Sequence, residues 1–328
     1  MKHILVLIML LLVGCDGFLE SKTKKSVFVI SSYHPEYAWD AAYTKGITDR
    51  LGGEYDLSFF SMDTKRLPRE EHPKMAAKAV DMVLSKKPDL VIVGDDAALK
   101  FTAPRLSRLD IPVVFLGINN NPNNYFSSWP QNITGVTERP LVHANILMLN
   151  NILPKASRVA VLLDDDLTAK LVKVEFFAGR DNLSIAGTDV DLHMFSTYQE
   201  WQTFITSSQH KYDAFIVGLY HTLKDAAGDV VPPDDVLRWT SSTSTVPLFC
   251  FWDFSIGPDL AIGGQVVSGE EQGQMAADLV KRIMAGAKPV EIPPLTGGNG
   301  KMMFSQAQLT RHGLTLPSTV ADTALIVD

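Results

Sequence analysis

The chain has 328 residues, with 37 acidic and 30 basic side chains and a formal net charge of −7 near neutral pH. This acidic balance disfavours a nucleic-acid-binding surface, so we expect no nucleic-acid partner. The length suggests two domains of ordinary size, each long enough to bury its own core.

The chain begins with a short apolar stretch that ends at a cysteine. Residues 4–13 are apolar, and Gly14 is the small residue that precedes Cys15. This order predicts a signal peptide over residues 1–14 and lipid attachment at Cys15. An apolar stretch of this length is too short to span a bilayer. The alternatives are an ordinary secretory signal peptide and a buried N-terminal strand.

Residues 15–25 are rich in charge and lack periodicity, which predicts a lipid-anchored tether with the folded part beginning near Ser26. Asp16 resembles the signal that retains lipoproteins at the inner membrane, so we expect the protein on the periplasmic side of that membrane. Loss of the signal peptide removes one basic side chain and leaves a formal charge of −8. With Cys15 acylated, Cys250 is the only thiol left, so no intramolecular disulfide can form.

Short apolar runs of β-forming residues alternate with longer segments of helical periodicity. The predicted strands are 27–30, 57–61, 90–93, 112–116, 159–163, 190–195, 214–217 and 246–251. The predicted helices are 38–51, 73–86, 140–152, 198–208, 234–242 and 275–284. Such alternation predicts an α/β fold class with parallel sheets that are covered by helices on both faces.

The strands form two comparable series, one up to residue 116 and one from residue 159, joined through residues 132–138. The simplest arrangement is two α/β lobes connected by crossing strands. Turn residues and a short strand between residues 289 and 304 indicate a further crossing. We expect one lobe to comprise residues 26–137 plus about 255–292, and the other 138–254 plus about 293–328.

Polar and aromatic side chains follow the predicted strands. In doubly wound sheets, ligands bind beyond the carboxyl ends of the strands, so these loops form the candidate site. Aromatic rings, carboxylates and amides in one cleft suit a small ligand with an apolar body and a cationic group. The loops are 31–39, 94–96, 117–122, 164–166, 218–221 and 252–253.

Some of these residues also have a purely structural interpretation. Asp95 and Asp96 either cap the helix that begins near Ala97 or face the cleft, and one can cap while its neighbour faces the cleft. For the run 164–166 we favour capping. Trp39 is either a core residue or a cleft residue, and the sequence leaves both open.

An ordered set of motifs resembles ABC-transporter substrate-binding proteins of the tryptophan-type family, and the related periplasmic sensor modules of bacterial signalling proteins. The resemblance covers nearly the whole chain after residue 14. It implies the periplasmic-binding-protein fold of type I, in which two hinged Rossmann-like lobes with parallel sheets close on a solute. The motifs are Ser32–Trp39, Met62–Arg66, Pro88–Ala97, Ile111–Asn119 and Thr134–Glu138.

The resemblance also implies which residues face the cleft. An α-amino group would pair with one of the carboxylates, backbone N–H groups at helix starts would hold a carboxylate, and an aromatic ring would stack. Carried over by position, the cleft receives Tyr33, His34, Asp95, Asp96, Asn119 and Glu138. From the second lobe we add Tyr220, Trp252 and Asp253.

We therefore expect a lipid-anchored receptor that captures a small molecule, an amino acid or a similar aromatic or amine compound, for an ABC permease. The alternative is a ligand-sensing subunit for a membrane histidine kinase or cyclase. An extracytoplasmic hydrolase is disfavoured because no Gly-x-Ser-x-Gly, His-Glu-x-x-His or Walker-type motif occurs in the sequence. The histidines lack metal-ligand spacing, so we expect no enzymatic activity, cofactor or metal.

Overall fold

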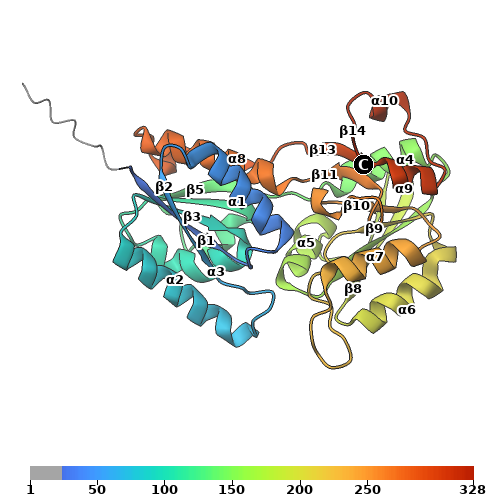
Figure 1. The fold of residues 1–328 in the computed structure, drawn as a ribbon, viewed down its shortest axis with the longest axis horizontal. Coiled ribbons are helices and arrows are strands. Elements are labelled where there is room, and N and C mark those ends of the chain that lie inside the picture. The colour runs from blue at the N-terminus through green and yellow to red at the C-terminus, as the bar shows by residue number, and fades with distance from the viewer. Residues whose placement is uncertain (1–23) are drawn as a thin grey trace, which may run out of the picture.

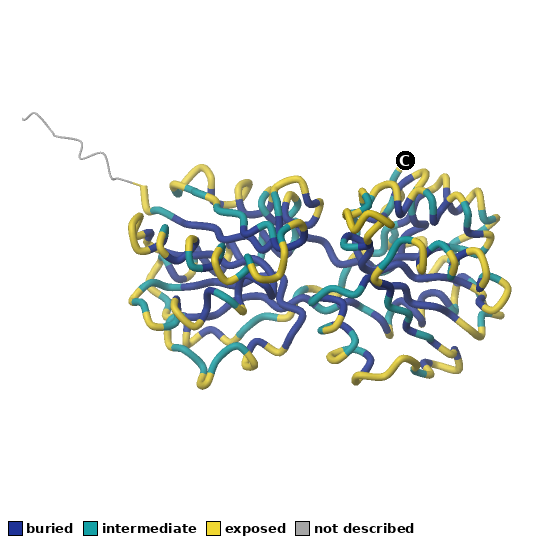
Figure 2. The backbone as a smooth tube through the Cα atoms, turned by 90° about the horizontal axis from the view of Figure 1, so that it is seen from below, coloured by how far each residue is buried: buried dark blue, intermediate teal, exposed yellow. Residues whose placement is uncertain are grey.

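The computed structural model describes residues 24–328, and within them two lobes lie side by side (Figure 1). The predicted signal peptide, Cys15 and most of the tether lie outside the described residues. The first strand begins at Ser26, as expected. Figure 2 shows the lobes as two bodies joined by a narrow waist, where buried segments cross from one to the other.

The first lobe is built on a six-stranded parallel sheet with the order β12-β5-β4-β3-β1-β2. Its strands are β1 (Ser26–Ser31), β2 (Asp56–Ser61), β3 (Leu90–Gly94), β4 (Val113–Ile118), β5 (Ile133–Thr137) and β12 (Leu295–Thr296). Its helices are α1 (Ala38–Leu51), α2 (His72–Lys86), α3 (Asp95–Leu106) and α8 (Gly269–Met284).

Alternate side chains of β1 enter two different cores, because successive residues of a strand point to opposite faces of the sheet. Val27 and Val29 pack in the cluster that contains α1 and α8, whereas Phe28 and Ile30 pack in the cluster that contains α2 and α3. Both faces are therefore covered, which explains the continuous apolar runs of the buried strands.

The second lobe has a five-stranded sheet with the order β10-β9-β6-β8-β7, in which only the edge strand β7 is antiparallel to its neighbour. Its strands are β6 (Arg158–Asp164), β7 (Asn182–Ile185), β8 (Thr188–Phe195), β9 (Ala214–Val217) and β10 (Leu248–Cys250). Its helices are α4 (Val142–Ile152), α5 (Leu167–Phe177), α6 (Tyr198–Ser208) and α7 (Pro233–Thr243). Helices α4 and α5 share one core with the first lobe's α1 and α8, and α6 and α7 share another.

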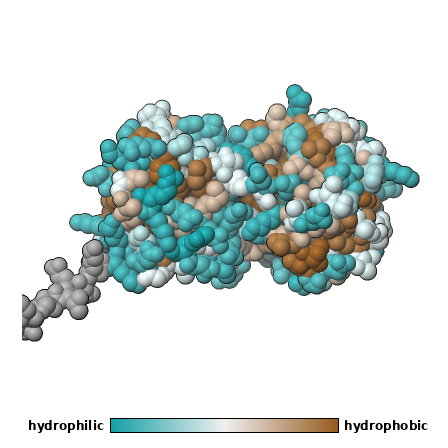
Figure 3. All heavy atoms as spheres, turned by 90° about the horizontal axis from the view of Figure 1, so that it is seen from above, coloured by the Kyte–Doolittle hydropathy of each residue, from teal (hydrophilic) through white to brown (hydrophobic). Residues whose placement is uncertain are grey.

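A three-stranded sheet completes the second lobe beside β10. It consists of β11 (Gly263–Val266), β13 (Lys301–Ser305) and β14 (Leu325–Val327), with the short helices α9 (Gln306–Arg311) and α10 (Ser318–Ala321) nearby. Seen from above, the molecular surface is mostly hydrophilic, and hydrophobic spheres gather mainly on this lobe (Figure 3). Among the described residues, no helix combines the length and the apolar character needed to cross a membrane.

The chain passes between the lobes three times: from β5 to α4, from β11 to α8, and from β12 to β13. The two later crossings follow residues 266 and 296, which corrects the expected positions near 255 and 293. The physical reason is strand pairing, because β11 pairs with β13 in the second lobe and β12 still pairs with β5 in the first.

The predicted α/β class with two Rossmann-like lobes is confirmed. Helices α1 and α6 have the predicted bounds, and α8 begins six residues earlier than the predicted 275. The edge strands β7 and β14 and the strand β11 were not predicted, since β7 is polar in sequence and β11 begins with two glycines.

Candidate functional site

A cavity that is partly open to solvent lies between the two lobes, at the carboxyl ends of their strands, where doubly wound folds bind ligands. All the space between its side chains amounts to about 260 Å³ when the part open to solvent is included, and the side chains fill most of the enclosed part, so a solute needs the lobes to part before it can enter. The lining residues are Tyr33, Tyr37, Trp39, Lys65, Asp95, Asn119, Glu138, Thr168, Leu219, Trp252 and Phe254.

Each lining residue follows a strand, so the sheets themselves position the site. The first lobe contributes the loop after β1 with the start of α1, and single residues after β2, β3, β4 and β5. The second lobe contributes Thr168 from the first turn of α5, Leu219 after β9, and Trp252 and Phe254 after β10.

Asp95 is a buried carboxylate held in an unusual backbone conformation. Its φ of 75° lies in the left-handed region, which Asp and Asn tolerate better than most residues. Its Oδ1 accepts hydrogen bonds from the Tyr33 hydroxyl at 2.9 Å and from the Asp96 backbone N–H at 3.1 Å. Burial, together with the charge of Asp96, raises the pKa of Asp95 to about 7.

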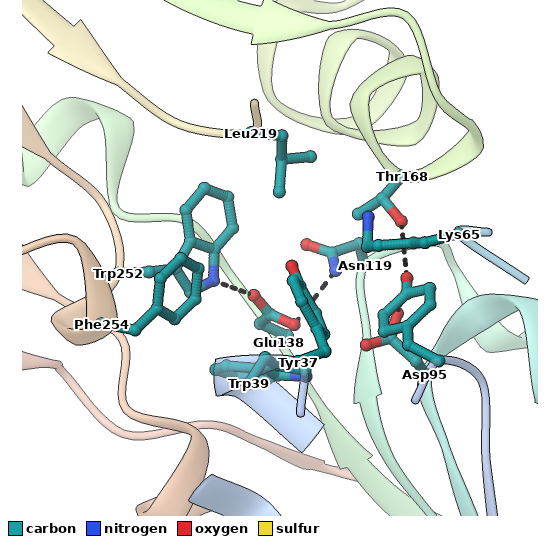
Figure 4. A pocket seen from close by; sticks show the side chains of 11 residues that line it. Tyr37, Trp39, Lys65, Asp95, Asn119, Glu138, Thr168, Leu219, Trp252 and Phe254 are labelled. Carbon is teal, nitrogen blue, oxygen red and sulfur yellow. Dashed lines mark hydrogen bonds between the residues drawn. The ribbon is translucent and has the colours of Figure 1, made fainter. Parts of the chain in front are cut away.

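Glu138 is the second buried carboxylate, and two neighbours hold it in place (Figure 4). The Trp252 indole N–H donates to Oε1 at 2.5 Å, and the Asn119 side-chain amide donates to Oε2 at 3.1 Å. Burial raises the pKa of Glu138 well above the ordinary value, and the nearby charge of Asp95 adds to this shift.

The bond to Glu138 fixes which end of the Asn119 amide is free. Because the amide nitrogen donates to Glu138, the Oδ1 atom of Asn119 lies buried without a hydrogen-bond partner among the described residues. The indole nitrogen of Trp39 is likewise buried and unpartnered within residues 24–328. Buried polar atoms of this kind are expected to meet a partner, and both belong to residues that line the cavity.

Lys65 is the cation of the cavity, and its side chain is only 3% exposed. Its Nζ lies 4.5 Å from the centre of the Tyr33 ring and 5.1 Å from that of the Tyr37 ring. The same atom lies 3.6 Å from Asp166 of the second lobe. Two cation–π contacts and one ion pair therefore engage Lys65.

Further contacts also connect the lobes directly. The Tyr33 hydroxyl lies 3.1 Å from that of Thr168, and the Tyr37 ring packs edge-on against His221 with 4.7 Å between ring centroids. Together with the bond from Trp252 to Glu138 and the ion pair of Lys65, these contacts hold the closed arrangement.

The structure brings five of the predicted site residues together in the cavity, namely Tyr33, Asp95, Asn119, Glu138 and Trp252. It places the other four around it. His34 pairs with Glu36 on an outer groove, and Tyr220 stacks on His221 and contacts the Ser255 hydroxyl.

Asp96 supports the cavity from behind, because it accepts hydrogen bonds from the backbone of Asn119 and Asn120 and from the Tyr125 hydroxyl. Asp253 begins the short 3-10 turn after Trp252, and its carboxyl group bonds to Ser268 rather than lining the cavity. Burial raises the pKa of both carboxyl groups.

The capping interpretation is not supported for the acidic runs. The N-cap residues of α3 and α5 are Gly94 and Asp166, and neither makes a side-chain capping bond within the described part of the chain. Asp164 instead accepts backbone N–H groups of His221 and Thr222, and thereby fixes the loop after β9. Trp39 is both a core residue and a cavity residue, because it is 3% exposed and also lines the cavity.

Five lining residues were not named as site residues from the sequence, although the first and the fourth lie in loops assigned to the candidate site: Tyr37, Lys65, Thr168, Leu219 and Phe254. Each of them follows a predicted strand, which is the same feature that indicated the other site residues. Lys65 follows the predicted strand 57–61, but that loop was not included in the candidate site. Thr168 follows the acidic run 164–166, which was assigned to helix capping, so Thr168 was not considered as a site residue.

Solved structures show which fold this chain shares. An ABC domain from Streptococcus pneumonia in complex with L-Trp is 19% identical with a TM-score of 0.69, covering 93% of this chain and 100% of that one. A ligand-free, open substrate-binding protein with adhesive properties from Clostridium difficile is 17% identical with a TM-score of 0.62, covering 93% and 99%. A leucine-binding protein from Thermotoga maritima is 14% identical with a TM-score of 0.51, covering 79% and 83%.

These similarities identify the fold as that of type I periplasmic binding proteins. Among curated proteins, no relative matches the chain. The model of the family described as ABC transporter substrate binding protein matches residues 60–327, which is most of the chain. The chain therefore belongs to the ABC transporter substrate-binding protein family.

Proposed function

We propose that this protein is a lipid-anchored, extracytoplasmic receptor that captures a small amine-bearing, aromatic solute and delivers it to an ABC permease. Family membership supports a substrate-binding role without a chemical step. The acyl anchor at Cys15 rests on the sequence pattern of residues 1–15, and it places the protein on the periplasmic side of the inner membrane.

One observation carries the ligand class: two buried carboxyl groups, Asp95 and Glu138, lie in one cavity with several aromatic rings. Buried carboxylates are costly unless a cation compensates them. An ammonium group supplies that charge and donates several N–H bonds, while the rings of Trp252 and Phe254 offer apolar surface to an aromatic body.

The contacts between the lobes support capture by closure. The residues that join the lobes also line the cavity, as Tyr33, Thr168, Glu138 and Trp252 do. A ligand that touches these side chains therefore biases the equilibrium between open and closed lobes. In a transport system, the permease then distinguishes loaded from empty receptor by the closed arrangement.

A thermal-denaturation screen of residues 22–328 against amino acids, amines, nucleosides and small peptides tests the proposal. A ligand at a hundred times its dissociation constant adds about 2.7 kcal/mol of stability. We expect aromatic amine-bearing compounds to raise the melting midpoint. Stabilisation only by nucleosides, or only by acidic amino acids and acidic peptides, would contradict the proposed ligand class.

The anchor and the partner need separate tests. In cells, labelled fatty acid should be incorporated into the wild-type protein and not into Cys15→Ser, which should also leave the membrane fraction. Crosslinking of the liganded receptor should recover a permease. Recovery of a histidine kinase or cyclase in its place would show that the receptor serves sensing rather than transport.

A further inference from the structure

The ionisable side chains that line the cavity are mostly acidic. Of the described residues that line it, Asp95 and Glu138 carry carboxyl groups and Lys65 alone is basic. Three more carboxyl groups are buried nearby: Asp40 accepts the Tyr33 backbone N–H, and Asp96 and Asp164 each hold a loop that borders the cavity. The surroundings therefore favour a positive ligand and oppose a negative group on it.

The lysine has its charge compensated within the protein. Its ammonium group lies against two tyrosine rings and 3.6 Å from Asp166, so a ligand carboxylate would have to compete with that ion pair. The other cation close to the site, Arg139, donates to the backbone carbonyl groups of Ile118, Asn119 and Glu138. Lys65 is thus already paired and Arg139 does not line the cavity, so neither is presented to a ligand there as the two-pronged partner that a carboxylate prefers.

The unpartnered atoms of the cavity also match an amine. Asn119 Oδ1 needs a donor, and an ammonium group provides one. Trp39 offers a single neutral N–H. No second ligand charge is required.

Building on the proposed function, we infer that the ligand is a monocationic aromatic amine that lacks the carboxylate of an α-amino acid. In an α-amino acid the carboxylate lies on the carbon that bears the ammonium group, so it would enter the same cavity among the acidic side chains. Like charges placed together in a buried site cost affinity, and the site thereby rejects the far commoner amino acids.

Matched pairs of probes test this inference with the full chain in detergent. Isothermal titration near pH 8 compares tryptamine with L-tryptophan, tyramine with L-tyrosine, and phenethylamine with L-phenylalanine. L-tryptophanamide keeps the bulk of the amino acid without its negative charge, and its titration is repeated near pH 7, where its α-amino group is still mostly protonated, so it separates charge from size. We expect each amine to bind at least about tenfold tighter than its amino acid, with the amide nearer to the amine.

The outcomes distinguish the two proposals. Amino acids that bind as tightly as the amines, or tighter, would overturn the inference and leave the receptor function intact. They would place the carboxylate at the start of α5 near Thr168. If none of the seven probes binds, both the inference and the proposed aromatic amine class are wrong.

A variant tests the same point from the protein side. In Glu138→Gln, the new side-chain amide can accept the Trp252 N–H only if its own NH₂ group faces Asn119. The Asn119 amide must then turn, so that it presents N–H groups rather than its oxygen to the cavity. We expect tryptamine affinity to fall at least about tenfold and the preference over L-tryptophan to shrink. The exposed Asp81→Asn, outside the cavity, is the matched control. An unchanged preference in Glu138→Gln, with an unchanged melting midpoint, would overturn the inference.

Discussion

Asp95→Asn should make the protein more stable while it weakens ligand binding. The substitution keeps the side-chain shape, and Asn tolerates the left-handed backbone at this position as well as Asp does. Its carbonyl oxygen can still accept the bonds from the Tyr33 hydroxyl and the Asp96 backbone. The change therefore removes the charge and little else.

The size of the effect follows from the pKa of Asp95, which the fold raises from 3.8 to about 7. Between these values the unfolded chain has released its proton while the folded chain still holds it. The folded state then binds more protons, so stability falls as the pH rises through this window and stays low above it. Three pH units at about 1.4 kcal/mol each give a cost of up to about 4 kcal/mol above pH 7.

Urea denaturation followed by circular dichroism at pH values from about 4 to 8 measures this difference. We expect wild type and Asp95→Asn to have similar unfolding free energies near pH 4, and the variant to be more stable by about 2 to 4 kcal/mol at pH 8. Asp81→Asn, an exposed carboxylate, should follow the wild-type curve. Parallel curves for wild type and Asp95→Asn would refute the reasoning.

Trp252→Phe removes the indole N–H that bonds to the Glu138 carboxyl group between the lobes, and a hydrogen bond to a charged group contributes about 1.5 to 3 kcal/mol. Amine affinity measured by calorimetry should therefore fall about tenfold or more. Unchanged affinity would show that closure does not need this hydrogen bond. Gly273→Ala places a methyl group against the backbone of Tyr43 where α1 and α8 meet, so the free energy of unfolding measured in urea should fall by about 1 to 3 kcal/mol. Gly53→Ala, which has no atom near the added methyl group, should leave the free energy of unfolding unchanged. Equal losses in the two variants would contradict this packing. Tryptamine affinity should rise between pH 6 and 8 as Asp95 ionises near 7, and a flat titration profile would argue against that carboxylate as the ammonium partner.

Much of the first-lobe half of the site was predictable because its rule is local. Residues directly after a parallel strand lie at the carboxyl edge of the sheet, and this rule selected the loops of Tyr33, Asp95 and Asn119, which the family resemblance then assigned to the cleft. The same rule applied to Lys65 and Thr168, but the loop of Lys65 was not included in the candidate site and Thr168 follows a run that was assigned to capping.

By itself, the sequence determined the alternation of strands and helices, and with it the two lobes, since apolar periodicity reflects which faces a segment buries. Only the tertiary structure decided which strand-end residues meet, because partners such as Trp252 and Glu138 are 114 residues apart and belong to different crossings. It also decided the raised pKa values of Asp95 and Glu138 and the free oxygen of Asn119. Those properties arise from burial and from side chains that the folded structure brings together, and neither has a periodic signal in the chain.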